Sequence, residues 1–180
     1  LGEEPPISGK FGSGTIFFAH CNLACRFCQN YEISQQGNGE EMTAEEIAAS
    51  MLSLQEQGCH NINLVTPSHV GPQILKSVLL AAQKGLKIPL VWNSCGYDGI
   101  ETLELFDGVI DIYMPDFKYG TNHEAASVSG VMDYTDCSKA AIKEMFKQVG
   151  DLVLDENGIA VKGVLVRHLV LPEDLSKTSE

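Results

Sequence analysis

Three cysteines within eight residues are the part of this sequence best suited to chemistry. Cys21, Cys25 and Cys28 supply three thiolates, and the run offers no obvious fourth ligand. A structural zinc site uses four protein ligands, and a simple [4Fe–4S] electron carrier uses four cysteines. At this cysteine content, chance would place roughly 0.007 such triads in a chain of this length. The triad therefore indicates a cluster in which one iron is left open for chemistry.

The elements that must position these thiolates are short apolar runs. Their apolar character is too continuous for a half-exposed sheet, which is typical of buried parallel strands. The cysteines directly follow the first run, and Asn157-Gly158 predicts a hairpin before the last one. The predicted strands are Thr15–Ala19, Asn61–Thr66, Leu90–Asn93, Val109–Met114 and Val164–Leu171.

Helix signals lie between the predicted strands. Thr43 and Glu46 match a capping box that begins a helix, and Gly58 ends it. A second helix is predicted from Pro72 to Gly85, where proline suits the first turn and glycine the end. Further helices are predicted over Ile100–Phe106, Asn122–Ser127 and Ala140–Val149.

Strand and helix alternate along the chain, which predicts an α/β fold with a parallel sheet. The glycine-rich turn of a dinucleotide-binding fold is missing, because Gly9, Gly12 and Gly14 precede the first strand rather than follow it. A partial (βα) barrel is therefore favoured over an open doubly wound sheet. We expect residues 1–180 to form a single domain whose ends are cut, with an N-terminal extension missing and the barrel truncated after its fifth strand.

Polar residues recur where the predicted strands end, which is the edge that holds the chemistry of parallel α/β proteins. Thr66 and Asn93 end the second and third strands, Asp116 and Lys118 follow the fourth, and Arg167 lies in the fifth. Structural interpretations stay open for three of them. Asp116 and Lys118 could form a solvated strand end, and Arg167 could belong to an ion pair.

Composition narrows the class of protein. The net charge is −12 and lysine and arginine form no run, which argues against a nucleic-acid partner. No stretch reaches the roughly 18 apolar residues of a membrane helix, and no signal peptide opens the sequence. We therefore expect no membrane partner and a cytoplasmic location, where thiols stay reduced. Cys59, Cys95 and Cys137 share no spacing and are predicted to be small buried residues.

The cysteine spacing, with the aromatic Phe27 before the third cysteine and Asn30 after it, resembles the radical S-adenosylmethionine (SAM) superfamily. More narrowly, the sequence is similar to uncharacterised relatives of the pyruvate formate-lyase activating enzyme. This resemblance implies a partial barrel of the radical SAM type. The similar segments are 15–34, 63–67, 111–119 and 166–172.

The resemblance also implies a cofactor and a reaction. Cys21, Cys25 and Cys28 would hold a [4Fe–4S] cluster whose fourth iron is chelated by the amino and carboxylate groups of SAM. An electron from the reduced cluster would split SAM into methionine and a 5′-deoxyadenosyl radical, which abstracts hydrogen from a substrate. The backbone around Phe27 is expected near the adenine.

Other positions match the SAM-binding residues of the family. Asp116 and Lys118 match an Asp-x-Lys element near the methionyl end of SAM, and Arg167 matches an arginine with a similar role. Lysine and arginine suit a carboxylate. Many members hold the methionyl amino group with Gly-Gly-Glu after the second strand, whereas Val-Thr-Pro-Ser stands here. Carbonyls and the Thr66 hydroxyl would have to substitute. Asn93 completes the candidate cofactor-binding set, and no catalytic residue is assigned.

Two functional classes compete. The first is a radical SAM enzyme supplied by a reducing electron donor protein of the flavodoxin or ferredoxin type, with a glycine of a partner protein as candidate substrate by family analogy. The second is a non-catalytic zinc or iron–sulfur module, in which the triad and a distant histidine or cysteine hold the metal. A thiol oxidoreductase that uses Cys25 and Cys28 is disfavoured, since Cys21 would be superfluous.

Overall fold

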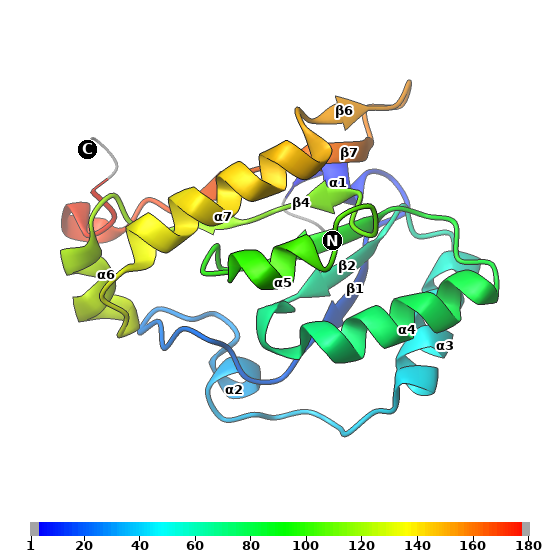
Figure 1. Cartoon of the computed structure of the whole chain (residues 1–180), viewed down its shortest axis with the longest axis horizontal. Helices are drawn as coiled ribbons and strands as arrows, with labels where there is room; N and C mark the ends of the chain where they lie inside the picture. Colours follow the sequence, from blue (N-terminus) through cyan, green and yellow to red (C-terminus); the bar gives the residue numbers. More distant parts are fainter. Residues whose placement is uncertain (1–3, 178–180) are drawn as a thin grey trace.

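The structure is a computed structural model that describes residues 4–177, and its centre is a mostly parallel sheet (Figure 1). The larger sheet has the strand order β1-β2-β3-β4-β7-β6, and β5 pairs with β8 in a second, two-stranded sheet. β6 runs antiparallel to β7, and the other pairs are parallel. The strands are β1 Gly14–Phe17, β2 Ile62–Val65, β3 Leu90–Asn93, β4 Ile112–Tyr113, β5 Asp116–Phe117, β6 Val153–Leu154, β7 Ala160–Val164 and β8 Arg167–His168.

Helices connect β1 to β2, β2 to β3, β3 to β4 and β5 to β6, as expected where the sheet neighbours run parallel. Within residues 4–177, no helix is long and apolar enough to cross a bilayer. The α-helices are α1 Pro5–Ser8, α2 Tyr31–Ser34, α3 Ala44–Glu56, α4 Gly71–Gln83, α5 Ile100–Glu104, α6 Asn122–Ser129 and α7 Tyr134–Val149. The short 3₁₀ helices are η1 Ser68–Val70 and η2 Pro172–Asp174.

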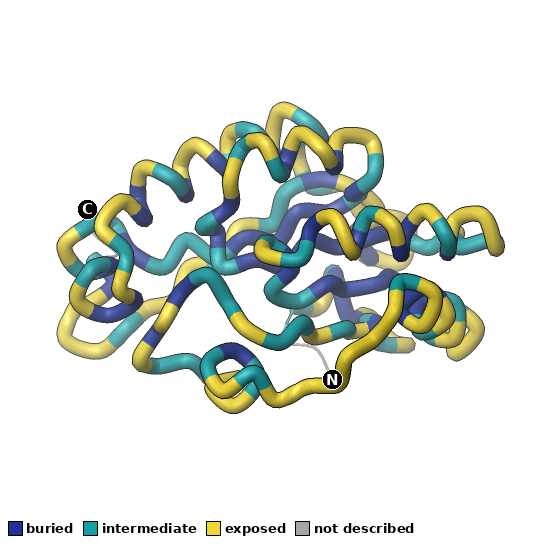
Figure 2. The backbone as a smooth tube through the Cα atoms, turned by 60° about the horizontal axis from the view of Figure 1, so that its bottom comes forward, coloured by how far each residue is buried: buried dark blue, intermediate teal, exposed yellow. Residues whose placement is uncertain are grey.

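The crossover helices α3, α4, α5 and α7 pack against one face of the sheet. That face presents alternate strand residues, including Leu64 of β2 and Trp92 of β3, to a core that all four helices share. The other face presents Val91 and Ile112, which pack against Ile7 of α1. Figure 2 shows the strands as the buried centre beneath helices with exposed outer faces. A doubly wound sheet places crossover helices on both faces, so the one-sided cover confirms the partial barrel.

Several local predictions are confirmed. The Thr43 hydroxyl accepts from the Glu46 backbone N–H (3.2 Å), and the Glu46 carboxylate accepts from the Thr43 backbone N–H (2.7 Å), so the capping box begins α3. β3 has the predicted bounds. The predicted hairpin joins β6 and β7, with Gly158 at a φ of 77° that suits a residue without Cβ.

The fourth strand was predicted too long, and the fifth was wrongly predicted as continuous. Within Val109–Met114 only β4 pairs, and the strand resumes as β5 after Pro115, which has no backbone N–H to donate. The predicted strand Val164–Leu171 instead begins at Ala160 as β7 and resumes as β8. The two breaks face each other, because Ile112 pairs with Gly163 and Asp116 pairs with Arg167. The interruption places Asp116 and Arg167 side by side beyond the main sheet.

Helix α7 begins at Tyr134, six residues before the predicted start at Ala140. Its first turns bury Tyr134, Thr135 and Ser138. Small polar residues interrupt the apolar pattern there, so hydrophobic periodicity does not detect this part of the helix.

Candidate functional site

The three cysteines lie in a loop between β1 and α2 that runs beside α6 (Figure 1). The backbone N–H of Ala24 donates to the Ser129 carbonyl (3.2 Å), and that of Arg26 donates to the Val128 carbonyl (3.0 Å). These carbonyls belong to the last turn of α6, where a helix leaves its carbonyls without intrahelical partners. The end of α6 therefore holds the middle of the cysteine loop.

Each sulfur of the triad has its own hydrogen-bonding neighbour. The Leu23 backbone N–H donates to Cys21 Sγ (3.4 Å). The Ser129 hydroxyl donates to Cys25 Sγ (2.9 Å). Cys28 Sγ lies 3.1 Å from the Ser34 hydroxyl oxygen. A group that donates to a cysteine sulfur stabilises the thiolate. In a metal centre, such hydrogen bonds to the ligand sulfurs also help to set the reduction potential.

The thiols differ in how readily they ionise. A hydrogen bond from the Cys95 thiol outweighs burial and lowers the pKa of Cys21 to about 6, with further help from the Leu23 N–H and the Lys118 ammonium. Burial raises the pKa of the Cys25 thiol. Metal ligation requires the thiolate form, and the lowered pKa favours that form for Cys21 whereas the raised pKa opposes it for Cys25.

The arrangement of donors bears on the kind of metal. Among residues 4–177, no three His, Cys, Asp or Glu side chains converge on a point that could hold one metal ion. Three cysteine thiols in one loop match the protein ligands of a [4Fe–4S] cluster that keeps one iron open, and they would equally supply three of the four ligands of a zinc site.

The predicted polar residues Asp116, Lys118, Arg167 and Asn93 form one connected network. The Lys118 ammonium lies 2.6 Å from Asp116 Oδ2. Arg167 Nε donates to Asp116 Oδ1 (2.9 Å), and Arg167 Nη2 donates to Asn93 Oδ1 (2.8 Å). The parallel pairing of β5 with β8 produces this contact, and it brings residues from three strands to one point.

The network is charged but internally compensated. Burial lowers the pKa of Lys118, but the Asp116 carboxylate outweighs burial and raises that pKa overall. Burial also lowers the pKa of Arg167, but the carboxylates of Asp116 and Glu4 outweigh burial and raise that pKa overall. Both cations therefore remain protonated at neutral pH, and both can bind a carboxylate.

Phe27 joins the network to the cysteine loop. The Lys118 ammonium lies 5.8 Å from the centre of the Phe27 ring, which is within cation–π range. The same ring meets Tyr119 edge-on at a centroid distance of 6.4 Å. The structure thus brings Phe27, Lys118 and the cysteines to the same edge of the sheet.

Thr66 lies where β2 ends and reaches its neighbours through the backbone. Its N–H donates to the Asn93 carbonyl (2.9 Å), and its φ is 59°. A left-handed backbone is rare for a β-branched residue, and such strain is typical of functional sites. On β2, the side-chain oxygen of Asn63 is buried without a hydrogen-bond partner. Strand β2 therefore carries an unsatisfied buried acceptor and is followed by a residue with a strained backbone.

Sequence reasoning missed Glu4 and Cys95. Glu4 Oε1 accepts a hydrogen bond from Arg167 Nη1 (3.1 Å). The two residues are 163 positions apart in the sequence, and no local pattern predicts their contact. Cys95 donates to Asn22 Oδ1 (3.2 Å) beside Cys21. Its position just after the third strand could have revealed it. The prediction that Cys59, Cys95 and Cys137 are small buried residues was wrong, because each is half-buried in a loop or at a helix start.

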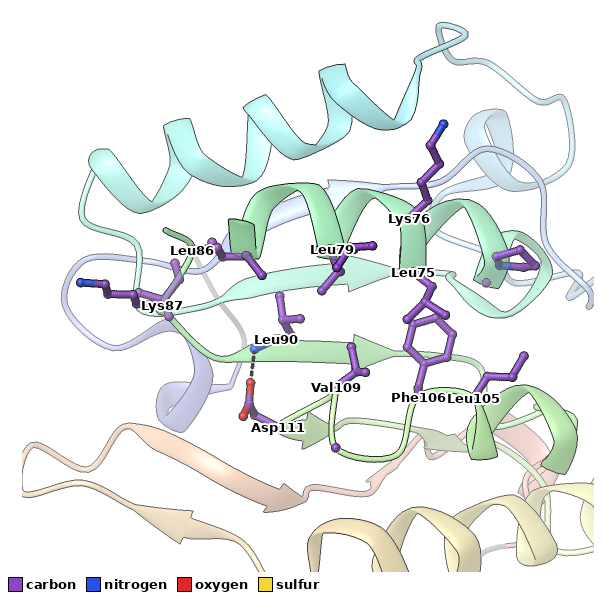
Figure 3. A pocket seen from close by; sticks show the side chains of 16 residues that line it. Leu75, Lys76, Leu79, Leu86, Lys87, Leu90, Leu105, Phe106, Val109 and Asp111 are labelled. Carbon is purple, nitrogen blue, oxygen red and sulfur yellow. Dashed lines mark hydrogen bonds between the residues drawn. The ribbon is translucent and has the colours of Figure 1, made fainter. Parts of the chain in front are cut away.

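A large pocket of about 750 Å³ lies elsewhere, between α4 and the connection from α5 to β4 (Figure 3). Leu75, Leu79 and Phe106 line it, and Lys76 and Lys87 lie at its border. Among its lining residues there is no cysteine and no member of the charged network. Its chemistry is that of an apolar groove, so the candidate site remains the cysteine edge.

Comparison with known proteins agrees with this geometry. Residues 15–173 match the family described as the Radical SAM superfamily. The chain is also 32% identical over 192 residues to the uncharacterized protein MJ0674 of Methanocaldococcus jannaschii. The alignment covers 100% of the chain and 50% of that protein, so the chain spans about half the length of its curated relative. With the one-sided barrel and the cysteine triad after β1, the match places this chain in the radical SAM superfamily.

Proposed function

We propose that Cys21, Cys25 and Cys28 bind a [4Fe–4S] cluster and that the chain catalyses hydrogen abstraction from a substrate. When bound and reduced, the cluster supplies one electron to SAM, which yields methionine and a 5′-deoxyadenosyl radical that takes a hydrogen atom from the substrate. The observation that carries this proposal is the shared location of the thiol triad and the charged network at one sheet edge. Phe27 links the two, with the Lys118 ammonium 5.8 Å from its ring.

The charged network suits the methionyl end of SAM, which carries a carboxylate and an ammonium group. Arg167 and Lys118 would bind the carboxylate, because both stay protonated. The Asp116 carboxylate, Asn93 and the backbone and hydroxyl of Thr66 would bind the ammonium group in place of the missing Gly-Gly-Glu. The backbone around Phe27 would lie against the adenine.

We infer further partners from the same chemistry. A flavodoxin-like or ferredoxin-like protein would supply the electron, and a reducing cytoplasm would keep the cysteines available for metal. The resemblance of the sequence to glycyl-radical activating enzymes makes a glycine of a partner protein the proposed substrate. These assignments rest on family analogy.

Cleavage of SAM tests this proposal. Reconstituted and chemically reduced protein should convert SAM to 5′-deoxyadenosine and methionine, measured by mass spectrometry under anaerobic conditions. A deuterated candidate substrate should transfer its label to 5′-deoxyadenosine. Protein that holds zinc and leaves SAM intact would instead favour the non-catalytic module.

A further inference from the structure

Glu4 brings a second carboxylate to the charged network from the opposite end of the sequence. Arg167 Nη1 donates to Glu4 Oε1 at 3.1 Å. The side chains of Glu4 and Arg167 are only 22% and 29% exposed, so solvent screens this ion pair less than a pair on the open surface. The contact can therefore influence how the guanidinium is held.

The backbone around Glu4 is fixed, so its carboxylate extends from a defined position. The Glu4 carbonyl accepts from the backbone N–H groups of Ile7 (2.9 Å) and Ser8 (3.0 Å). Ile7 is buried against the sheet face opposite the crossover helices. The side-chain amide of Asn61 donates to the Ile7 carbonyl (2.7 Å). Glu4 thus reaches the network from a segment that is anchored to the sheet.

Glu4 contacts a different corner of the Arg167 guanidinium from its other partners. Nε and Nη2 lie 2.9 and 2.8 Å from Asp116 Oδ1. Nη2 also donates to Asn93 Oδ1 (2.8 Å). These two partners hold one edge of the planar group, and the group could still tilt about that edge. The contact of Glu4 with Nη1 holds the opposite corner, so the three residues together fix the plane of the guanidinium.

The plane of the guanidinium matters for the proposed cofactor. A guanidinium recognises a carboxylate through a planar fork of N–H groups, which requires a defined orientation. A group that is already oriented loses little freedom when its ligand binds, and this favours affinity. Nη1 carries two N–H groups, so Glu4 can hold this nitrogen by one of them while the other binds a ligand.

Building on the proposed function, we propose that Glu4 is a positioning residue that orients the Arg167 guanidinium for the methionyl carboxylate of SAM. Glu4 acts through Arg167 and does not contact the cofactor itself. An ion pair that only stabilises the fold would change the free energy of unfolding and leave the affinity for SAM unchanged. A positioning residue changes that affinity, and its effect disappears when the guanidinium is absent.

Calorimetric titration of the reconstituted protein with SAM tests this inference. Glu4→Ala removes the contact, so SAM should bind roughly 3–10-fold more weakly. Glu4→Gln keeps an acceptor of the same reach, so its affinity should lie between those of Glu4→Ala and the unsubstituted protein. Adding Glu4→Ala to Arg167→Lys should weaken binding no further, because no planar fork remains to be oriented. Glu45→Ala removes a carboxylate from the ion pair with Lys76 on α3, and this matched control should bind SAM normally.

Other results would overturn the inference. Unchanged affinity in Glu4→Ala, with a lowered denaturant midpoint, would assign the ion pair to stability alone. Tighter binding would mean that the Glu4 carboxylate competes with SAM for Arg167. Equal weakening with Arg167 and with Lys at position 167 would mean that Glu4 acts independently of the guanidinium. If Glu4→Ala failed to fold, unchanged affinity in Glu4→Gln would contradict the role. An unsubstituted protein that holds its cluster but does not bind SAM would reject the proposed function as well.

Discussion

Trp92 and Asn93 are neighbours in β3 but lie in different environments. Trp92 is fully buried in the core beneath the crossover helices, where its ring packs against that of Phe106. The two ring centroids are 4.6 Å apart. Asn93 points to the opposite face and accepts a hydrogen bond from Arg167. Alternation along one strand thus separates residues that stabilise the fold from residues that can bind a ligand.

The same contrast extends to whole regions. The helix side combines an apolar core with the apolar groove of Figure 3, where Leu79 and Leu105 are exposed. The cysteine edge combines thiols, hydroxyls and charged groups, most of which hydrogen-bond to one another. Substitutions on the helix side should therefore change the free energy of unfolding, whereas substitutions at the cysteine edge should change metal or SAM binding.

The largest effect is expected at the triad. Cys25→Ala should abolish cluster assembly, because a buried ligand is lost and the Ser129 hydroxyl loses its acceptor. Cys59→Ala should leave assembly intact. Iron and sulfide analysis after anaerobic reconstitution measures both. Equal loss in the two variants would mean that the triad is not the ligand set.

The next effect belongs to the helix side. Leu64 is fully buried in the core beneath the helices, and Leu64→Ala should lower the free energy of unfolding by about 2–5 kcal/mol. Denaturant midpoints of the variant and the unsubstituted protein give this difference. Under native conditions the variant should still assemble its cluster. A variant of normal stability that lost its iron would break the separation between the two regions.

A smaller effect is expected in the charged network. Arg167→Lys keeps the charge but loses the planar fork that reaches both Asp116 and Asn93. Hydrogen bonds to charged groups contribute about 1.5–3 kcal/mol, so SAM should bind roughly 10–100-fold more weakly. Calorimetric titration of the reconstituted protein measures the affinity. Lys87→Arg, at the border of the apolar groove, is the charge-preserving control and should bind SAM normally.

The smallest effect concerns pH and the start of α3. Hydrogen bonds from the Thr43 backbone and hydroxyl lower the pKa of Glu46 below its ordinary value. The ionised carboxylate therefore stabilises the fold above the unfolded-state pKa, and this contribution is lost as pH falls through the lowered folded-state pKa. Denaturant midpoints across the acidic range should show a weaker pH dependence for Glu46→Gln. Identical pH profiles would contradict the contribution of this cap.

Local features could be predicted from the sequence because they depend on adjacent residues. The capping box at Thr43, the bounds of β3 and the hairpin at Gly158 are of this kind. The separate strand β8 depends on its pairing with β5, so the apolar pattern alone predicted Val164–Leu171 as one continuous strand. Apolar periodicity reports burial along one element and carries no information on which elements meet.

Some residues of the candidate site could likewise be predicted from the sequence, and others could not. The triad and the strand-end positions of Asp116 and Lys118 follow from spacing and strand order. The contact of Glu4 with Arg167 and that of Cys95 with the cysteine loop depend on the packing of distant segments. Long-range contacts of this kind require the folded topology, since nothing in the neighbouring residues specifies them.

The most direct test of the central claim is the EPR spectrum of the reconstituted and reduced protein, recorded with and without SAM. We predict about four iron and four sulfide per chain and a reduced-cluster signal that changes when SAM is added, because SAM would occupy the open iron. Stoichiometric zinc, or a cluster signal that SAM leaves unchanged, would contradict the account.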